Sequence, residues 1–407
     1  MKTSASFTFH GAWRSLTSAL LAASLAAGCG GGGGGIAGVD TGGTGTAVSF
    51  SAGRIAGFGS IIVNGVRFDD STARIVDDDG TAHPRSDLKL GMQTAVQAGP
   101  VTTDAATGVA SSQATTIKFA SQIRGPVQTL DVVAGTLTVL GQTVKVDAAT
   151  VFDGAVGLGG LAVANLVEVY AFFDAATASY TATRIELKPS LADFKLVGPV
   201  AALNTAAKTF TIGGATIGYA GVPAAALPAL SNGLVVRVHV QTVRQGSVWV
   251  ATSLAADAPA VADGAETEVE GFVTDFTSAA SFKVGGVAVN AAGPGVTFKS
   301  GSAAQLANGV RVEVEGVTRA GVLAAASVDV KTSGGGDQQF ELHGAIESVN
   351  AAARSFVLRG VPVSYDGATR FDDGTAAGLA VGVSVEVKGV LAAGGTRLAA
   401  TRIKFDR

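Results

Sequence analysis

The chain has 407 residues, of which 47% are hydrophobic and 15% charged, with 56 glycines, a single cysteine and a net charge of −3. This composition excludes an intrinsically disordered protein, because disordered chains are poor in apolar residues and rich in charge. A single cysteine excludes a disulfide-stabilised fold, and the mildly acidic balance argues against nucleic acid as a partner.

Residues 1–28 have the pattern of an export signal. Lys2 and Arg14 are the only Lys, Arg, Asp or Glu residues in this stretch, and they precede an apolar segment, 16–27, that is too short to span a bilayer. The segment ends in Leu25-Ala26-Ala27-Gly28-Cys29. This ending resembles the lipobox of bacterial lipoproteins, although the leucine lies four residues before the cysteine rather than three.

Cys29 is therefore the predicted lipidation site, and the Gly-rich residues 29–47 are the predicted tether. The alternative is an ordinary signal peptide with an incidental cysteine. Loss of Lys2 and Arg14 from the 29 basic residues leaves 27 against 32 acidic ones, a net charge of −5 for the mature chain. Gly30 rather than aspartate follows the cysteine, which favours the outer membrane, on its periplasmic face or at the cell surface.

The rest of the sequence repeats itself five times. A glycine within an alternating apolar stretch recurs at spacings of 72, 73, 73 and 73 residues, at Gly53, Gly125, Gly198, Gly271 and Gly344. A second glycine, in a predicted hairpin turn, follows it in every copy, at Gly65, Gly141, Gly214, Gly286 and Gly360. A Leu-x-x-Gly corner also recurs, at Leu88–Gly91, Leu230–Gly233, Leu306–Gly309 and Leu379–Gly382, with Ala164 in place of the glycine in the second copy.

The fifth copy shows the predicted plan of each repeat. Its alternation and turn residues predict three strands, one helical turn and two further strands, at 340–349, 355–358, 361–365, 375–379, 383–390 and 397–405. The glycine inside the first strand predicts a bend. This is the order of an OB-type barrel, and closure of the sheet removes open edges. A small β-sandwich is the alternative.

The predicted fold class is therefore all-β, with five tandem five-stranded OB-like barrels after the signal and the tether. Repeats 1 to 5 are expected at 48–120, 121–190, 191–260, 265–333 and 338–407.

The first copy carries a resemblance to a known family. Its segment Gly53-Arg-Ile-Ala-Gly-Phe-Gly-Ser-Ile-Ile-Val-Asn-Gly-Val-Arg-Phe68 resembles a domain family of unknown function that occurs in lipoproteins of Gram-negative bacteria, often in tandem. The pattern extends through 48–407 and weakens in the later copies. The resemblance implies an envelope location and a small β-barrel, and it implies no activity.

Few residues suggest chemistry. The histidines beyond the signal are His83, His239 and His343. His239 and His343 have no nearby acidic or cysteine partner in a familiar spacing, so a metal or nucleophile–base pair would have to form across repeats. The acidic clusters at 69–70, 77–79 and 372–373 could bind Ca²⁺, but solvated turns are the preferred interpretation. Trp249 and the repeat-matched phenylalanines Phe152, Phe210, Phe282, Phe298, Phe356 and Phe371 are expected in cores rather than on a ligand-stacking face.

Two hypotheses of function follow. The preferred one is a non-catalytic envelope module that binds or spaces a protein or a cell-surface polymer, with no cofactor and no metal. The alternatives are an envelope enzyme with a site assembled between repeats, or a module that binds calcium or polysaccharide.

Overall fold

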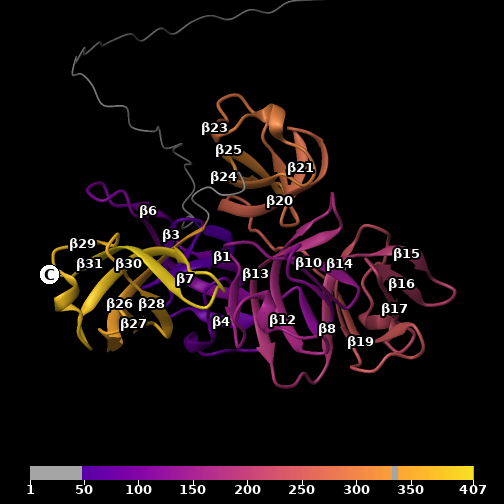
Figure 1. Ribbon diagram of the computed structural model, residues 1–407. Coiled ribbons are helices and arrows are strands. Elements are labelled where there is room, and N and C mark those ends of the chain that lie inside the picture. The colour runs from indigo at the N-terminus through magenta and orange to yellow at the C-terminus, as the bar shows by residue number, and fades with distance from the viewer. Residues whose placement is uncertain (1–47, 332–337, 407) are drawn as a thin grey trace, which may run out of the picture. The chain divides into compact units, whose positions relative to one another are not determined.

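The computed structural model describes residues 48–331 and 338–406, and within them the chain is all-β (Figure 1). The predicted fold class of repeated small five-stranded barrels is confirmed. In the described part of the chain no helix is both long and apolar enough to cross a membrane.

Repeat 5 shows how each barrel closes. Its five main strands are β26 (Gln339–Asn350), β27 (Ser355–Leu358), β28 (Val361–Ser364), β30 (Ser384–Leu391) and β31 (Leu398–Phe405). β26 pairs antiparallel with β27 and β30, and β27 pairs antiparallel with β28. The third strand, β28, then pairs in parallel with the fifth, β31, which is antiparallel to β30. This closed order is that of an OB-type barrel.

The other barrels repeat this order. Repeat 1 uses β1 (Ser49–Phe58), β2 (Ile61–Val63), β3 (Val66–Asp69), β5 (Gln93–Ala98) and β7 (Ala110–Phe119), with β6 (Thr102–Thr103) added beside β7. Repeat 2 uses β8 (Ile123–Asp131), β9 (Thr136–Val139), β10 (Gln142–Lys145), β12 (Leu166–Asp174) and β13 (Ser179–Lys188).

Repeat 3 uses β14 (Phe194–Pro199), β15 (Ala201–Asn204), β16 (Thr209–Ile212), β17 (Ala215–Gly218), β18 (Val235–Val240) and β19 (Val248–Ala256), where β14 and β15 are the two halves of an interrupted first strand. Repeat 4 uses β20 (Glu266–Ser278), β21 (Ser281–Val284), β22 (Val287–Asn290), β24 (Arg311–Arg319) and β25 (Val322–Val330).

The segment between the third and fourth main strands differs from the prediction. Four repeats add a short strand that pairs in parallel with the last strand, namely β4 (Arg74–Asp77), β11 (Val151–Asp153), β23 (Thr297–Ser300) and β29 (Arg370–Asp372). The predicted helical turn is a single 3-10 turn in each repeat: η1 (Arg85–Asp87), η2 (Leu158–Gly160), η3 (Ala224–Ala226), η4 (Ala303–Gln305) and η6 (Ala376–Gly378). Three or four extended residues are too few to show an alternating pattern in the sequence.

The first-strand glycine is explained by close approach of the hairpin that follows it. A Cβ atom on Gly125 would lie 2.7 Å from the side chain of Leu140, the residue just before the hairpin glycine. The equivalent glycines also face residues of the hairpin that follows, and Gly344 faces Arg359 in this way. The glycine therefore makes room for a hairpin that folds back over the strand, which the sequence interpretation as a bend did not include.

Backbone hydrogen bonds connect the first strand of each barrel to the Leu-x-x-Gly corner, at the corner's last residue and the residue that follows it. In repeat 5 the amide of Gly382 donates to Ile346 O at 2.9 Å, and the amide of Ile346 donates to Val383 O at 2.9 Å. Every repeat has the same reciprocal pair. The corner residue has a positive φ of 85° at Gly382, and Ala164 adopts 69° without a glycine.

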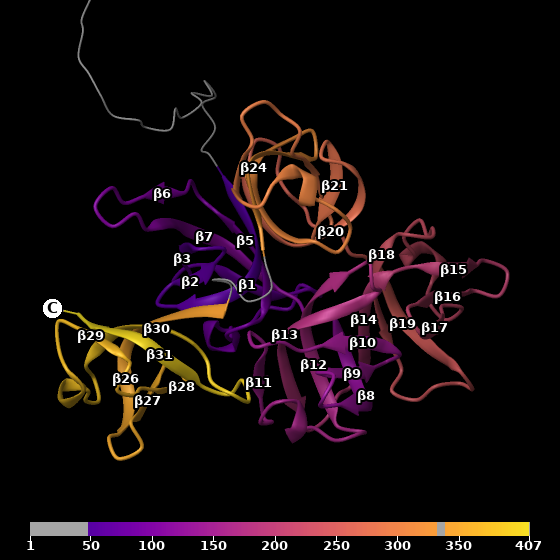
Figure 2. The ribbon, with the colours of Figure 1, turned by 45° about the horizontal axis from the view of Figure 1, so that its top comes forward.

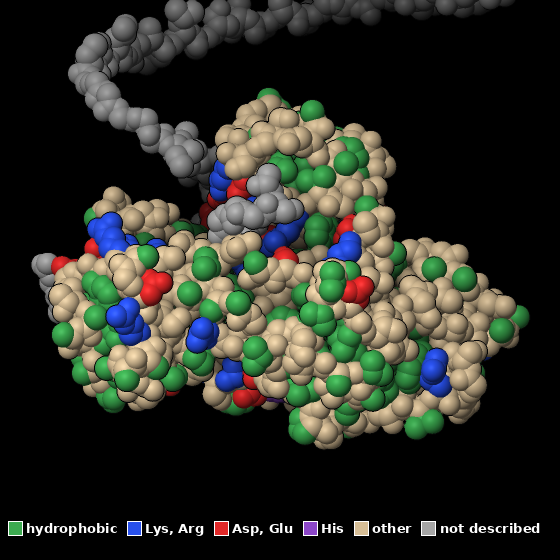
Figure 3. All heavy atoms as spheres, viewed as in Figure 1, with side chains coloured by type: hydrophobic (Ala, Val, Ile, Leu, Met, Phe, Trp, Pro, Cys, Tyr) green, Lys and Arg blue, Asp and Glu red, His purple; other side chains and the backbone are tan. Residues whose placement is uncertain are grey.

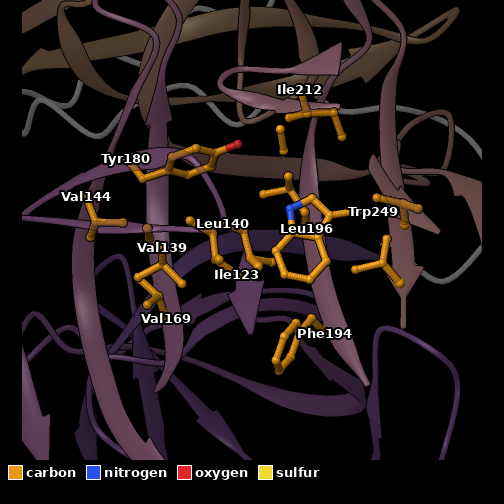
Figure 4. Close-up of a cluster of buried hydrophobic side chains, with 14 of the residues drawn as sticks. Ile123, Val139, Leu140, Val144, Val169, Tyr180, Phe194, Leu196, Ile212 and Trp249 are labelled. Carbon is orange, nitrogen blue, oxygen red and sulfur yellow. The ribbon is translucent and has the colours of Figure 1, made fainter. Parts of the chain in front are cut away.

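Strand pairing also joins different repeats. β1 pairs in parallel with β20 through its first half and with β26 through its second half, so repeats 1, 4 and 5 share one sheet (Figure 2). β8 pairs antiparallel with β14, so repeats 2 and 3 share the other sheet. The core follows the same division, and Figure 4 shows Tyr180 of repeat 2 and Leu196 of repeat 3 in one buried cluster.

Candidate functional site

The acidic turn of repeat 1 is ordered by its own first carboxylate. Asp77 ends β4, and its Oδ1 accepts hydrogen bonds from the amides of Asp79 at 3.0 Å and Thr81 at 2.8 Å. Burial raises the pKa of Asp77, but the Thr81 amide and His83 outweigh it and the net shift of the pKa is downward. The Asp77 carboxylate therefore fixes the backbone of the turn that carries Asp78 and Asp79.

Asp78 is buried against a lysine of repeat 3. Its two carboxylate oxygens accept hydrogen bonds from Lys195 Nζ at 3.0 and 2.8 Å, and the two side chains are 4% and 2% exposed. Lys195 lies on β14, the strand of repeat 3 that pairs with β8 of repeat 2. The interpretation of this cluster as a solvated turn is therefore wrong at Asp78, because a cation from another repeat replaces the water.

Asp79 extends the same contact. It forms an ion pair with Arg237, whose Nε lies 3.1 Å away, and it lies 3.1 Å from His239 Nε2. The other ring nitrogen of His239 lies 2.8 Å from Asp193, which also pairs with Arg124 of repeat 2 at 2.9 Å. We call this set, Asp78, Asp79, Arg124, Asp193, Lys195, Arg237 and His239, the Asp78 joint. It connects repeats 1, 2 and 3 by charge.

His83, His239 and His343 each lie beside a carboxylate. His83 lies 2.9 Å from Asp87 through Nδ1 and 3.3 Å from Asp77 through Nε2. The hydrogen bond with Asp87 is the largest cause of its raised pKa. His343 lies 2.7 Å from Asp406. The spacing between His343 and Asp406 is too long to be recognised along the sequence, and Asp79 reaches His239 from another repeat.

The remaining acidic turns are held by arginines. Asp70 is buried and accepts two hydrogen bonds from Arg85, at 2.6 and 2.5 Å. Asp372 accepts hydrogen bonds from Arg402 and Arg370, and the bond from Arg402 is the largest cause of its lowered pKa. Among residues 48–331 and 338–406, no group of three or more His, Cys, Asp or Glu side chains is arranged to hold a metal ion.

Repeat 4 holds a pair of glutamates that sequence reasoning missed. Burial is the first cause, and the neighbouring Glu313 and Glu315 the next, of a pKa of about 9 at Glu268. A side-chain hydrogen bond joins Glu268 to Glu313, whose pKa is also raised by burial. The Glu268 carboxyl therefore retains its proton at neutral pH.

A polar pocket of about 430 Å³ draws on three repeats. Repeat 1 contributes Arg54 and Asn64, and repeat 5 contributes Gln339, Phe340 and Glu341. Repeat 4 contributes Glu270, Ser300, Glu313, Asp329, Val330 and Lys331, and three further residues of repeat 1 complete the lining: Ala56, Ile62 and Gly65. The guanidinium of Arg54 is buried and lies 4.8 Å from the centre of the Phe340 ring. The pocket therefore offers a ligand positively charged donors, negatively charged acceptors and neutral amide groups.

The other predicted residues divide between core and the undescribed part of the chain. Trp249 is 6% exposed and packs edge-on against Phe194, with ring centres 5.6 Å apart. The repeat-matched phenylalanines Phe152, Phe210, Phe282 and Phe356 are buried, and Phe298 and Phe371 are half-buried. Cys29 lies outside the described residues.

Comparison with known proteins matches three of the five repeats to a family of unknown function. The model of the family "Domain of unknown function (DUF5666)" matches residues 124–186, 270–329 and 343–404. These ranges fall within repeats 2, 4 and 5, so the chain contains a tandemly repeated domain of unknown function with OB-like barrels. No curated protein matches the chain.

A solved structure named "drosophila Unr CSD456" is similar at 13% identity, and the match covers 52% of this chain and 98% of that chain, with a TM-score of 0.16. The OB-type assignment therefore depends on the strand order of the barrels described above.

Proposed function

We propose that this chain is a lipid-anchored protein of the bacterial outer membrane, whose tandem OB-like domains act as a non-catalytic binding or spacer module. The observation that carries the proposal is the position of β1, which pairs with both β20 and β26. Together with the Asp78 joint, this pairing connects repeat 1 to repeats 3, 4 and 5, and through repeat 3 to repeat 2. Repeats connected in this way form one scaffold, which is what a module needs in order to present a surface to a partner.

The pocket supports binding as the role of that scaffold. Its lining of carboxylates, amides and basic groups suits a polar ligand such as a saccharide unit of a cell-surface polymer. Titration calorimetry with soluble fragments of envelope polysaccharide tests this assignment. We expect Gln339→Ala to weaken binding and Gln241→Ala, at an exposed glutamine outside the pocket, to leave it unchanged. Equal affinity in both variants would contradict binding at the pocket.

The lipid anchor is tested separately. Cells that produce the wild type or Cys29→Ser are grown with a fatty-acid analogue, and the protein is isolated from each. Because Cys29 is the only cysteine, we expect the label to be lost completely in the variant. Label that persists in Cys29→Ser would refute the anchor, and wild-type protein found only in the inner-membrane fraction would refute the location.

An envelope enzyme is the second candidate, because the pocket collects its polar side chains from repeats 1, 4 and 5. We expect the purified chain to show no hydrolase activity on envelope polymers. Turnover that is lost in Gln339→Ala and kept in Gln241→Ala would favour the enzyme over the binding module.

A further inference from the structure

One end of repeat 2 carries an unusual exposed apolar surface. The turn between β8 and β9 has two valines at its tip, Val132 and Val133, which are 59% and 101% exposed. The loop between β11 and β12 adds Val156 and Val163, at 69% and 60% exposed. We call these four valines the valine end.

The two segments lie at the same end of the barrel. β8 runs antiparallel to β12, and the amide of Ala164 donates to Val127 O at 2.8 Å. The Cγ1 atom of Val132 comes within 3.9 Å of the position that a Cβ on Gly159 would take. The exposed valines therefore form one surface rather than two isolated tips.

This surface carries little formal charge: the turn begins at Asp131, whose Oδ1 accepts a hydrogen bond from the amide of Ala134 at 2.8 Å, and no charged residue follows in the turn itself. Residues 132–144 and 154–167 contain no Asp, Glu, Lys, Arg or His. Around the barrel that holds β8 and β12, the face shown in Figure 3 has many hydrophobic and few charged side chains. Turn tips are ordinarily polar, and the same turns of repeats 3 and 5 read Asn-Thr-Ala-Ala-Lys and Asn-Ala-Ala-Ala-Arg, at 204–208 and 350–354. The pair Val132 and Val133 is therefore absent from the same turn of repeats 3 and 5, whereas Val163 has an equivalent at the corner of repeat 5, the 67% exposed Val381.

We propose that the valine end rests against the lipid bilayer, as a second and weaker membrane contact beside the lipid at Cys29. This inference depends on the proposed lipid anchor. Residues 29–47 lie between the lipid and repeat 1, and a chain of this length spans at most about 65 Å when fully extended. Repeat 1 is thereby confined near the bilayer, and the Asp78 joint and the pairing of β8 with β14 connect repeat 2 to it.

The bilayer fits this surface better than water does. Exposed aliphatic side chains gain by transfer to an apolar medium, and a surface with little formal charge loses little hydration of ions when it enters the interface. Four valines are too few to hold a protein on a membrane alone. The anchor raises the effective concentration of the bilayer, so a weak contact suffices.

The experiment places a fluorescent probe on the valine end. The mature chain with Cys29→Ser carries a hexahistidine tag in place of the acyl groups. The tag holds the chain on vesicles of phosphatidylethanolamine and phosphatidylglycerol that also contain a lipid with a nickel-chelating headgroup. A single cysteine, Val133→Cys, carries an environment-sensitive dye, and some vesicles contain lipids with a nitroxide quencher. The matched control is Val243→Cys, a 73% exposed valine of repeat 3 that is followed by Arg244.

We expect the dye at residue 133 to shift to the blue on the vesicles and to lose fluorescence to the quencher, and the dye at residue 243 to do neither. Equal behaviour at the two positions, or no change at residue 133, would overturn the inference. Because the tag replaces the natural anchor, this outcome is independent of whether Cys29 is lipidated in cells. Failure of the fatty-acid label would refute the anchor instead.

Discussion

Removal of Asp78 should be the most damaging single change at the Asp78 joint. In Asp78→Ala the ammonium of Lys195, which is 2% exposed, loses the carboxylate that accepts both of its hydrogen bonds. An uncompensated buried charge costs about 3–5 kcal/mol of stability. Lys195→Met should cost less, about 2 kcal/mol, because Arg237 Nε lies 3.9 Å from Asp78 and remains as a cation. The double variant should cost less than the sum of the two single ones, since it removes both charges.

Urea unfolding followed by the fluorescence of Trp249 measures these losses. Trp249 packs on Phe194, which adjoins Lys195 in the chain, so it reports on the repeat that receives Asp78. Lys283→Ala is the control, because Lys283 forms a 2.9 Å pair with Asp275 at the surface and should change stability by no more than about 0.5 kcal/mol. If Asp78→Ala costs no more than this control, the burial of Asp78 against Lys195 is wrong.

Three further predictions follow from other contacts. Burial raises the pKa of Glu268 from its ordinary 4.5 to about 9 in the folded chain, so stability should fall as pH rises through that window. Glu268→Gln should flatten this slope in thermal unfolding, and an unchanged slope would contradict the shift. Gly125→Ala should destabilise by about 1–3 kcal/mol, because the new Cβ meets Leu140, whereas Gly367→Ala, with no atom within 4 Å, should be close to neutral in urea unfolding. A protease site placed in 333–336 should give a fragment, 338–407, that still co-elutes with the rest of the chain, since β26 pairs with β1; separate elution would contradict that pairing.

The strands could be predicted because their signals are local. In repeat 5 the expected segment 355–358 is the observed β27, and the expected 340–349 falls within β26. The alternation of apolar and polar residues and the hairpin glycines are patterns of a few residues, so the strands can be predicted from the sequence of a single repeat. The parallel pairing of β29 with β31 could not be predicted, because it joins segments distant in the chain and β29 has only three residues.

The charged contacts between repeats were hidden for a different reason. Asp78 followed by Asp79 and glycine has the composition of a solvated turn, and Lys195 has that of an outward strand position. Only the docking of one repeat on another makes them a buried pair. The basic side chains of Arg237 and His239, two residues apart on β18, were the one available signal that this face receives acidic groups.

The position of β1 has a consequence for how the chain is made. β1 is the first strand of the described chain, yet two of its neighbours, β20 and β26, belong to repeats 4 and 5. Arg67 and Glu341, which pair across this region, are 274 residues apart. During synthesis repeat 1 exposes an open strand edge until most of the remaining chain has followed, and open edges invite pairing with other chains. Such distant contacts form slowly, so the repeat that is made first is completed among the last.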